Sequence, residues 1–429
     1  MLTGSYRKRL NADLIKWVGE GLLSADSASA IRGSLAREGG FRLPALLGMF
    51  GGLLIAASVA AFVAANWEEI PRLVKLGMIL AGVIVALATA ARLQSRGSSS
   101  GADAAATCGV LVFAAGIALI GQMYHLPADW PAGAMLVAIG ALAVALLLRS
   151  DGALVIAFVA ICAWSAGRWE ESEGARHVAF FALYLPALWL AWPRRNRLVH
   201  HLAVLALALW LALLPGNWAI GRFDYALLAY ALAVSAFYVS LGAFALDRGR
   251  PALLTACLPW GLIGLLIVLN VELIRILDAT ESRAGHAFWL VFVAYAVAVP
   301  AVMAVAALAR ERRFAWPLAV ALILALLVPP VFWSGGVVGL GGKIVIASLI
   351  LFSAIALVVA GAIGGDRRIL ISGSALFGIA ILILLWQTIG TLLDQSLFFL
   401  VAGAVLLGLA SGARRLFARL NPPASEGAA

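Results

Sequence analysis

The chain has 429 residues, of which 64% are hydrophobic and only 12% charged, and its mean hydropathy is +1.02. Soluble domains carry roughly 45–50% apolar and about 25% charged residues, so this composition excludes an ordinary soluble protein and predicts an integral membrane protein. The net charge of +10 lies mostly in short segments between apolar runs, which indicates membrane topology and argues against nucleic-acid binding.

The first 43 residues are polar to mixed in character, and the apolar runs begin after them. One face of a predicted helix carries Leu10, Leu14, Trp17 and Val18. Ser24 is placed to cap a second helix that ends at Gly39-Gly40. We therefore predict a cytoplasmic helical hairpin over residues 1–43, too small to fold alone, that docks on the membrane domain or on a partner. No cleavable signal peptide is expected ahead of so late an apolar run.

Residues 44–412 are predicted to form an all-α, polytopic transmembrane bundle, because apolar runs close to the length of a helical span recur along them. We expect about fourteen spans, and residues 413–429 form a cytoplasmic tail. The predicted spans are 44–65, 73–91, 104–121, 131–148, 152–167, 178–192, 198–214, 225–245, 251–270, 286–309, 316–333, 343–362, 369–387 and 396–412.

Most of the 31 Lys and Arg residues fall on one side of this predicted bundle. That side receives the N-terminal segment and the connections with Arg149, Arg194, Arg248, Arg310 and Arg367. By the positive-inside rule, both termini are expected in the cytoplasm of a bacterial inner (plasma) membrane. The connection at residues 94–103, QSRGSSSGAD, is expected to be a flexible cytoplasmic linker.

Neither a metal site nor a cofactor is indicated by the pattern of metal-binding residue types. Cys108, Cys162 and Cys257 lie far apart inside apolar runs, and we expect buried free thiols there. The pair His200-His201 follows a basic connection and lacks the spacing of a metalloprotease helix. We therefore expect no cofactor.

The first candidate site lies in FVAANWEEIP, residues 62–71, where an apolar run ends in Asn66, Glu68 and Glu69. Small residues recur every fourth position before it, at Gly48, Gly52, Ala56, Ala60 and Ala64. Glu68 continues that spacing and would face a neighbouring helix. The alternative is a helix boundary, in which Pro71 starts the next span and the carboxylates favour its N-terminus. Acids that precede other predicted spans, such as Asp129 and Asp366, support the second interpretation.

The other candidates share a position at a predicted outer helix end. They are Gln122, Tyr124 and His125 in GQMYHLPADW, Asn270 and Glu272 near His286, and Asp394 in WQTIGTLLDQ. Together with Asn66, Glu68 and Glu69 they would line an outward-facing vestibule. Interfacial solvation of helix ends predicts the same pattern, so both interpretations stay open.

Four stretches of the chain resemble the bacterial membrane-protein family called domain of unknown function 2157. They are LIKWVGEGLLSADSASAIR, FVAANWEEIP, GQMYHLPADW and LLLRSDGAL. The resemblance covers about residues 10–165, and LFFLVAGAVLLGLA at residues 397–410 is similar to the closing helix of such proteins. It implies a polytopic inner-membrane protein with a cytoplasmic N-terminal helical segment. It implies no activity and no catalytic residue.

Many spans without a large extramembrane domain favour a transporter or channel-like protein for a small solute or lipid. The alternative is a membrane scaffold or sensor that binds a cytoplasmic protein through the hairpin. An enzyme acting on a lipid-linked substrate is a third hypothesis, but it needs convergent acid–base groups that no motif here supplies. The expected partners are the lipid bilayer together with a small solute or lipid, or with a cytoplasmic protein at the N-terminal hairpin. Nucleic acid is not an expected partner.

Overall fold

We describe the protein from a computed structural model, which divides the chain into two compact units, residues 1–75 and 76–429. The description covers residues 4–29, 70–125, 129–216, 225–249, 251–278, 288–334 and 340–388. All regular elements in these ranges are helices, and fourteen helices are assigned. The predicted all-α class is therefore confirmed.

The first unit contains helix α1, Gly4–Gly19, and the start of a second helical segment at residue 25. Leu14 is buried, in agreement with the predicted apolar face of α1. The hydroxyl of Ser24 accepts a hydrogen bond from the backbone N of Ser27 (3.2 Å), which is the predicted helix cap. The remainder of the predicted hairpin lies outside the described residues, so the hairpin as a whole stays a prediction.

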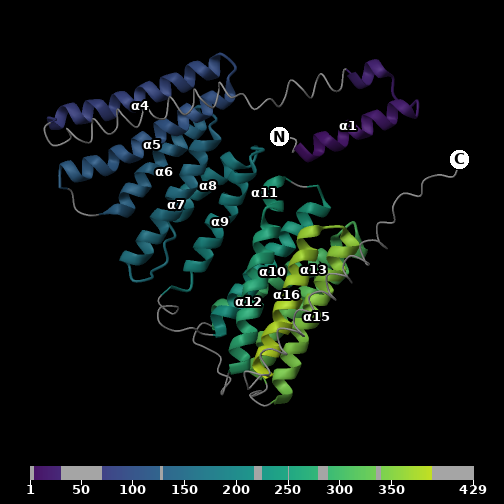
Figure 1. Ribbon diagram of the computed structural model, residues 1–429. Coiled ribbons are helices and arrows are strands. Elements are labelled where there is room, and N and C mark those ends of the chain that lie inside the picture. The colour runs from purple at the N-terminus through teal and green to yellow at the C-terminus, as the bar shows by residue number, and fades with distance from the viewer. Residues whose placement is uncertain are drawn as a thin grey trace. The chain divides into compact units, whose positions relative to one another are not determined.

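The second unit begins with an N-terminal helix group, α4–α9 (Figure 1), in which α7 packs against α6, α8 and α9. Its helices are α4 (Arg72–Ser95, entering this unit at Leu76), α5 (Ser99–Met123), α6 (Trp130–Leu147), α7 (Asp151–Glu171), α8 (Phe180–Ala191) and α9 (Arg197–Leu213). Alanines dominate the contact of α6 with α7, including Ala138, Ala141 and Ala157, all buried. Small side chains let these helices approach closely, and the resulting van der Waals contacts stabilise their association in the membrane.

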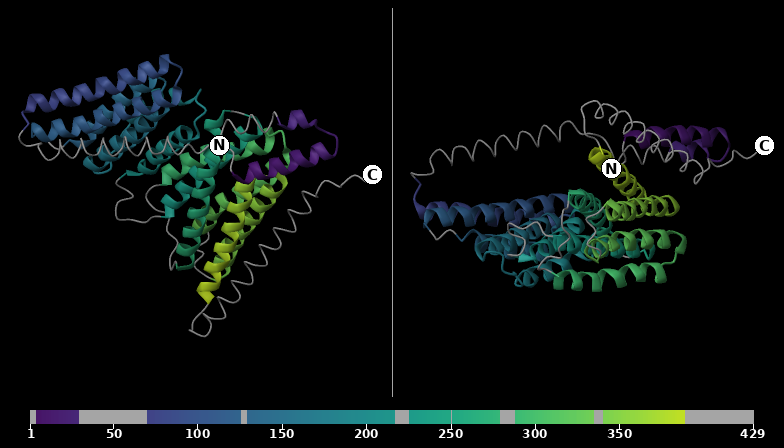
Figure 2. Two further views of the ribbon diagram at one scale, coloured as in Figure 1. Left: turned by 45° about the horizontal axis from the view of Figure 1, so that its top comes forward. Right: turned by 90° about the horizontal axis from the view of Figure 1, so that it is seen from below.

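A C-terminal helix group follows, and its long helices lie side by side in Figure 1 and in the left view of Figure 2. They are α10 (Tyr225–Asp247), the short α11 (Ala252–Thr255), α12 (Cys257–Asp278), α13 (Phe288–Leu308), α14 (Arg312–Ser334), α15 (Leu340–Gly364) and α16 (Arg367–Thr388). Leucines on α12, among them Leu262, Leu265 and Leu269, are buried in the core of this group. Gly261 allows α12 to pack against α10, because a Cβ there would lie 2.6 Å from the backbone N of Val239.

Ten of the described helices are long and apolar enough to cross a membrane. Large apolar side chains such as Leu73, Ile84 and Phe292 are exposed on their surfaces, as expected for contact with lipid. Helix α8 has 12 residues and is about 18 Å long, which is short of a bilayer core of about 30 Å. The predicted spans 44–65 and 396–412 lie outside the described residues. The protein is thus a multi-helix membrane protein.

Contacts among the helix ends agree with the two sides assigned from the sequence. On the basic side, the carboxylate of Asp247 accepts hydrogen bonds from the backbone N of Arg310 (2.8 Å) and of Glu311 (3.0 Å). On the opposite side, Lys343 Nζ donates to the carbonyl of Leu277 (2.5 Å). These contacts each join two connections that the sequence places on the same side.

Two sequence-based predictions are wrong. The ten residues 94–103 are not a flexible linker, because α4 continues to Ser95 and α5 begins at Ser99, which leaves a three-residue turn. Of the three cysteines predicted to be buried, Cys108 is exposed, Cys162 is half-buried and Cys257 is buried. Sequence hydropathy measures only how apolar a run is, and it does not distinguish a lipid-facing side chain from one facing another helix.

Candidate functional site

Four of the predicted site residues fall outside the described part of the chain. They are Asn66, Glu68, Glu69 and Asp394. The predicted vestibule is therefore not tested as a whole. Its described residues lie at the end of α5 and on α12.

Gln122, Tyr124 and His125 mark the C-terminal end of α5, and all three side chains are exposed. The backbone N of Tyr124 donates to the carbonyl of Ile120 (3.1 Å), and His125 has a positive φ of 50°. A left-handed residue just after the last helical turn is a common way for a helix to end. These residues therefore form the C-terminal end of α5.

The next helix begins at Asp129, as the sequence predicts. Its carboxylate accepts a hydrogen bond from the backbone N of Ala132 (2.9 Å) and forms an ion pair with Arg168 of α7 (3.0 Å). The hydrogen bond from Ala132 and the interaction with Arg168 lower the pKa of Asp129 below its ordinary value. This acid therefore caps α6 and joins it to α7.

Asn270 and Glu272 on α12 are both buried, with exposed fractions of 8% and 2%. The side-chain Nδ2 of Asn270 donates to the carbonyl of Leu266 (2.7 Å), while its Oδ1 has no hydrogen-bond partner among the described residues. Two positions along an α-helix are separated by roughly 200° of rotation. The two side chains consequently leave α12 in nearly opposite directions and do not form the predicted polar cluster.

Glu272 lies on the core-facing side of α12, in line with buried Leu265, Leu269 and Ile276. One of its carboxyl oxygens, Oε2, has no hydrogen-bond partner among the described residues. Almost all buried polar atoms in folded proteins are hydrogen-bonded, so an unpartnered carboxyl oxygen is unusual. This atom is the strongest candidate for direct chemistry in the described part of the chain.

The surroundings of Glu272 contribute no described ion pair. Lys343 reaches the same end of α12, but its ammonium group donates to the carbonyl of Leu277. The hydroxyl of Tyr295 on α13 is within electrostatic range of the Glu272 carboxyl and donates to the carbonyl of Leu326 (3.0 Å). Tyr295 was missed by the sequence analysis, because a single tyrosine in an apolar run carries no positional signal.

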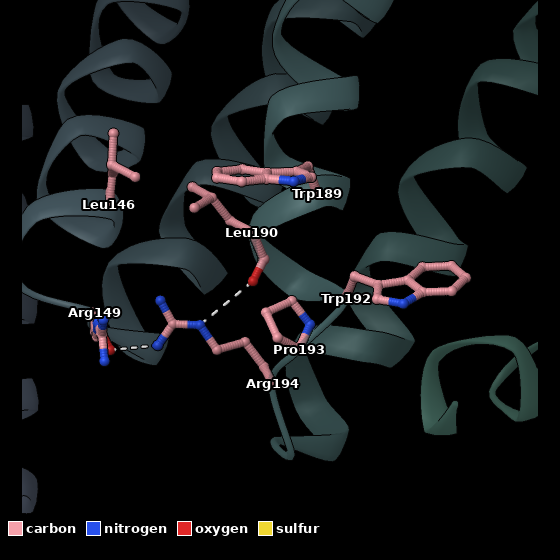
Figure 3. A pocket seen from close by; sticks show the side chains of 7 residues that line it. All are labelled: Leu146, Arg149, Trp189, Leu190, Trp192, Pro193 and Arg194. Atoms are coloured by element: carbon pink, nitrogen blue, oxygen red, sulfur yellow. Dashed lines mark hydrogen bonds between the residues drawn. The ribbon is translucent and has the colours of Figure 1, made fainter. Parts of the chain in front are cut away.

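A second feature is a cavity of about 700 Å³ at the basic-side ends of α6 and α8. Figure 3 shows Trp189 and Trp192 beside the cavity and the guanidinium of Arg194 extended toward Arg149. Leu146 and Leu190 supply apolar walls. Tryptophans beside arginines are typical of the level of lipid head groups.

The guanidinium of Arg194 is already engaged by the protein. It donates to the carbonyls of Arg149 (2.5 Å), Ala145 (3.2 Å) and Leu190 (3.4 Å), and it pairs with Asp151 (3.2 Å). These bonds satisfy carbonyls at the ends of two helices, which otherwise lack intrahelical donors. Arg194 is therefore a structural clasp between α6, α7 and α8 rather than a ligand-binding cation.

A family comparison matches residues 15–154, a stretch that holds the capped start of the second helical segment and helices α4, α5 and α6. These residues match the family described as "Predicted membrane protein (DUF2157)". The family resemblance inferred from the N-terminal motifs is thereby confirmed. No curated protein and no solved structure matches the chain. The DUF2157 match ends in the first turns of α7, so Glu272 and the C-terminal helix group lie beyond it.

Proposed function

We propose that the protein is a proton-coupled membrane transporter of a small solute, with Glu272 as its proton-binding group. The observation that carries the proposal is a carboxyl oxygen without a described partner on a fully helix-packed face of α12. An ionised carboxylate at such a position costs several kcal/mol unless it is paired. Ionisable residues inside a membrane bundle mark ion pathways more often than they serve packing.

The geometry around Glu272 favours a proton over a metal cation. A hard cation such as Na⁺ or Ca²⁺ binds several oxygen ligands at once, whereas a proton needs one oxygen. Asn270 points away from Glu272, and the hydroxyl proton of Tyr295 is donated to Leu326. Asn270 thus adds no oxygen ligand beside Glu272, and the carboxyl group by itself is enough to bind a proton.

The position of Glu272 along α12 also supports a coupling role. It lies six residues before the end of the helix at Asp278, or about 9 Å along its axis. A group at this depth is separated from the nearer surface by fewer than two helical turns. A modest rearrangement of the helix ends would let it exchange a proton with water on the predicted outer side.

The test is proton flux into liposomes that contain the purified full-length protein and a trapped pH indicator. With a mixture of small solutes supplied outside the liposomes, we expect a pH gradient to dissipate faster than in protein-free liposomes, and Glu272→Gln to remove the difference while keeping the shape of the side chain. Glu311→Gln, which changes an exposed glutamate of the same unit, is the matched control. Equal flux for the wild type and the Glu272→Gln variant would exclude this function.

We further propose that the connections rich in arginine face the cytoplasm of a bacterial inner membrane. The contacts of Asp247 with Arg310 and Glu311 support one common side for two of these connections. Labelling of single cysteines introduced at Arg195 and at Glu173 with a membrane-impermeant reagent tests the orientation. Intact cells should react at Glu173 only, and the reverse pattern would reject the assignment.

A scaffold role is the second candidate, because the first unit exposes Ile15, Trp17 and Leu22. Such exposed apolar side chains are suited to a protein partner. Photo-crosslinking from Ile15 in cells should capture one defined protein. Capture of lipid and of the chain itself only would argue against this role.

A further inference from the structure

A cavity of about 450 Å³ lies among α9, α11, α12 and the start of α16, and it shares no lining residue with the cavity of Figure 3. Its polar lining consists of Arg197, His200, His201, Thr255 and Arg368. Ala252, Ala256 and Pro259 form the apolar remainder. His200 and His201 lack metalloprotease spacing, but anion binding needs no such spacing.

His200 is the decisive residue of this cavity. Its side chain is 2% exposed, and neither Nδ1 nor Nε2 has a hydrogen-bond partner among the described residues. A neutral imidazole always carries one N–H donor, and a protonated one carries two. A buried donor without an acceptor costs about 1–3 kcal/mol, so an acceptor that enters the cavity would stabilise the fold.

His201 is oriented by Trp260, whose indole N–H donates to His201 Nδ1 (3.1 Å). Because Nδ1 accepts this bond, the proton of the neutral ring lies on Nε2, which makes Nε2 a donor. Thr255 contributes no donor, since its hydroxyl donates to the carbonyl of Ala252 (2.8 Å). His201 therefore has an N–H donor for the cavity, and His200 lies in the cavity wall with both ring nitrogens buried.

The charged side chains of the lining are both cationic. Arg197 forms no hydrogen bond or ion pair with a described residue, and both arginines lie within electrostatic range of His201. The carboxylate of Asp366 lies 4.0 Å from Arg368 Nε. This carboxylate also accepts hydrogen bonds from the backbone N of Arg368 (2.8 Å) and of Ile369 (3.4 Å), so it serves as the cap of α16. Arg197 thus lacks a described counter-ion.

The first turns of α9 and α16 add to the positive potential. Arg197 is the first residue of α9 and Arg368 the second of α16. Helix N-termini carry partial positive charge and bind anions. These helix ends alone would not define a site, but they surround a buried imidazole that lacks an acceptor.

We propose that this cavity binds a phosphate group, either as free phosphate or as the head group of an anionic lipid. A tetrahedral phosphate presents several acceptor oxygens, which match the N–H group of His201 and the guanidinium groups of Arg197 and Arg368, and the buried imidazole of His200 adds a donor in the cavity wall. The cavity is of the size of small-molecule sites, so it also has room for the ester substituent against Ala252, Ala256 and Pro259.

The experiment uses the purified full-length protein in nanodiscs of phosphatidylcholine, with and without an equal part of phosphatidylglycerol. Binding of radiolabelled inorganic phosphate is measured in the first, and retention of phosphatidylglycerol by native mass spectrometry in the second. Saturable phosphate binding assigns the free-phosphate source, and retention of phosphatidylglycerol without phosphate binding assigns the lipid source. Absence of both overturns the proposal.

The double variant Arg197→Gln/Arg368→Gln should weaken the observed binding by at least about tenfold, the effect of losing one charge-assisted hydrogen bond. The control Arg195→Gln/Arg367→Gln removes the same charge from neighbouring exposed residues outside the lining and should bind as the wild type does. Equal weakening in both double variants would indicate a diffuse basic surface and would reject the site. His200→Phe, which fills the cavity without an N–H donor, should also weaken binding; unchanged binding would contradict the role of His200.

Discussion

Asp103 of α5 holds the N-terminus of α7 through Ser150. The Oδ1 atom of Asp103 accepts a hydrogen bond from the hydroxyl of Ser150 (2.5 Å) and another from the backbone N of Gly152 (3.0 Å). The Ser150 hydroxyl in turn accepts from the backbone N of Ala153 (3.0 Å). Two helices separated by almost fifty residues in sequence thus share one capping network, and its acid also favours the positive end of α7.

Asp103→Ala should lower the free energy of unfolding by about 1–2 kcal/mol, because it removes a cap and leaves a half-buried helix start without its acceptor. Thermal unfolding in detergent measures the effect. Glu170→Ala, at an exposed position of α7, should change the transition little. If both variants unfold at the same temperature as the wild type, the network does not contribute to stability.

Gly261→Ala should destabilise the C-terminal helix group, because the added methyl group meets the backbone of α10 at Val239. Overpacking of this kind costs about 1–3 kcal/mol. Gly341→Ala is the matched control, since a Cβ at that position has no neighbouring atom within 4 Å. In the same detergent, Gly261→Ala should unfold at a lower temperature than the wild type, and Gly341→Ala at the same or a higher temperature.

Arg194→Gln should reduce stability by about 1–3 kcal/mol through the loss of the carbonyl contacts at the ends of α6 and α8. Arg195→Gln removes the same charge from an exposed neighbour and should leave stability nearly unchanged. The comparison distinguishes the loss of the Arg194 hydrogen bonds from the loss of one positive charge. Equal losses in the two variants would show that the hydrogen bonds drawn in Figure 3 are not the source of the effect.

Stability should fall as pH decreases below about 6.5 because of His177, in the connection between α7 and α8. Burial, together with the positive charge of Arg168, lowers the pKa of this imidazole in the folded protein. The unfolded chain therefore takes up the proton first, and the stabilising difference is present above pH 6.5 and lost between that value and the lower folded pKa.

His177→Gln should flatten this part of the pH profile, measured by thermal unfolding between neutral and mildly acidic pH. The ring of His177 packs edge-on against Trp164, with centroids 4.4 Å apart, so the variant should also be somewhat less stable at neutral pH. His125→Gln, at an exposed residue, is the control. A profile that keeps its slope in the His177→Gln variant would assign the pH dependence to another group.

The candidate site was only partly predictable. The sequence singled out Glu272 because a carboxylate near a helix end is visible in an apolar background. It grouped Glu272 with Asn270, whereas the helical rotation between them sends the side chains to different faces. His200 was dismissed on spacing, because burial without a partner is a property of the packed neighbours and not of the local sequence.

The sequence alone determined the helical class and most helix positions, and the two sides of the bundle stay its prediction. Run length, capping residues such as Asp129 and Asp366, and the uneven distribution of arginine are local properties, and the bilayer converts them directly into helices and topology. Tertiary packing decided which polar atoms lose access to water: Asp103 caps a distant helix, and Glu272 and His200 are buried with polar atoms that lack described partners. Both helix-facing and lipid-facing surfaces are apolar in a membrane protein, so hydropathy cannot specify which helices meet or what they enclose.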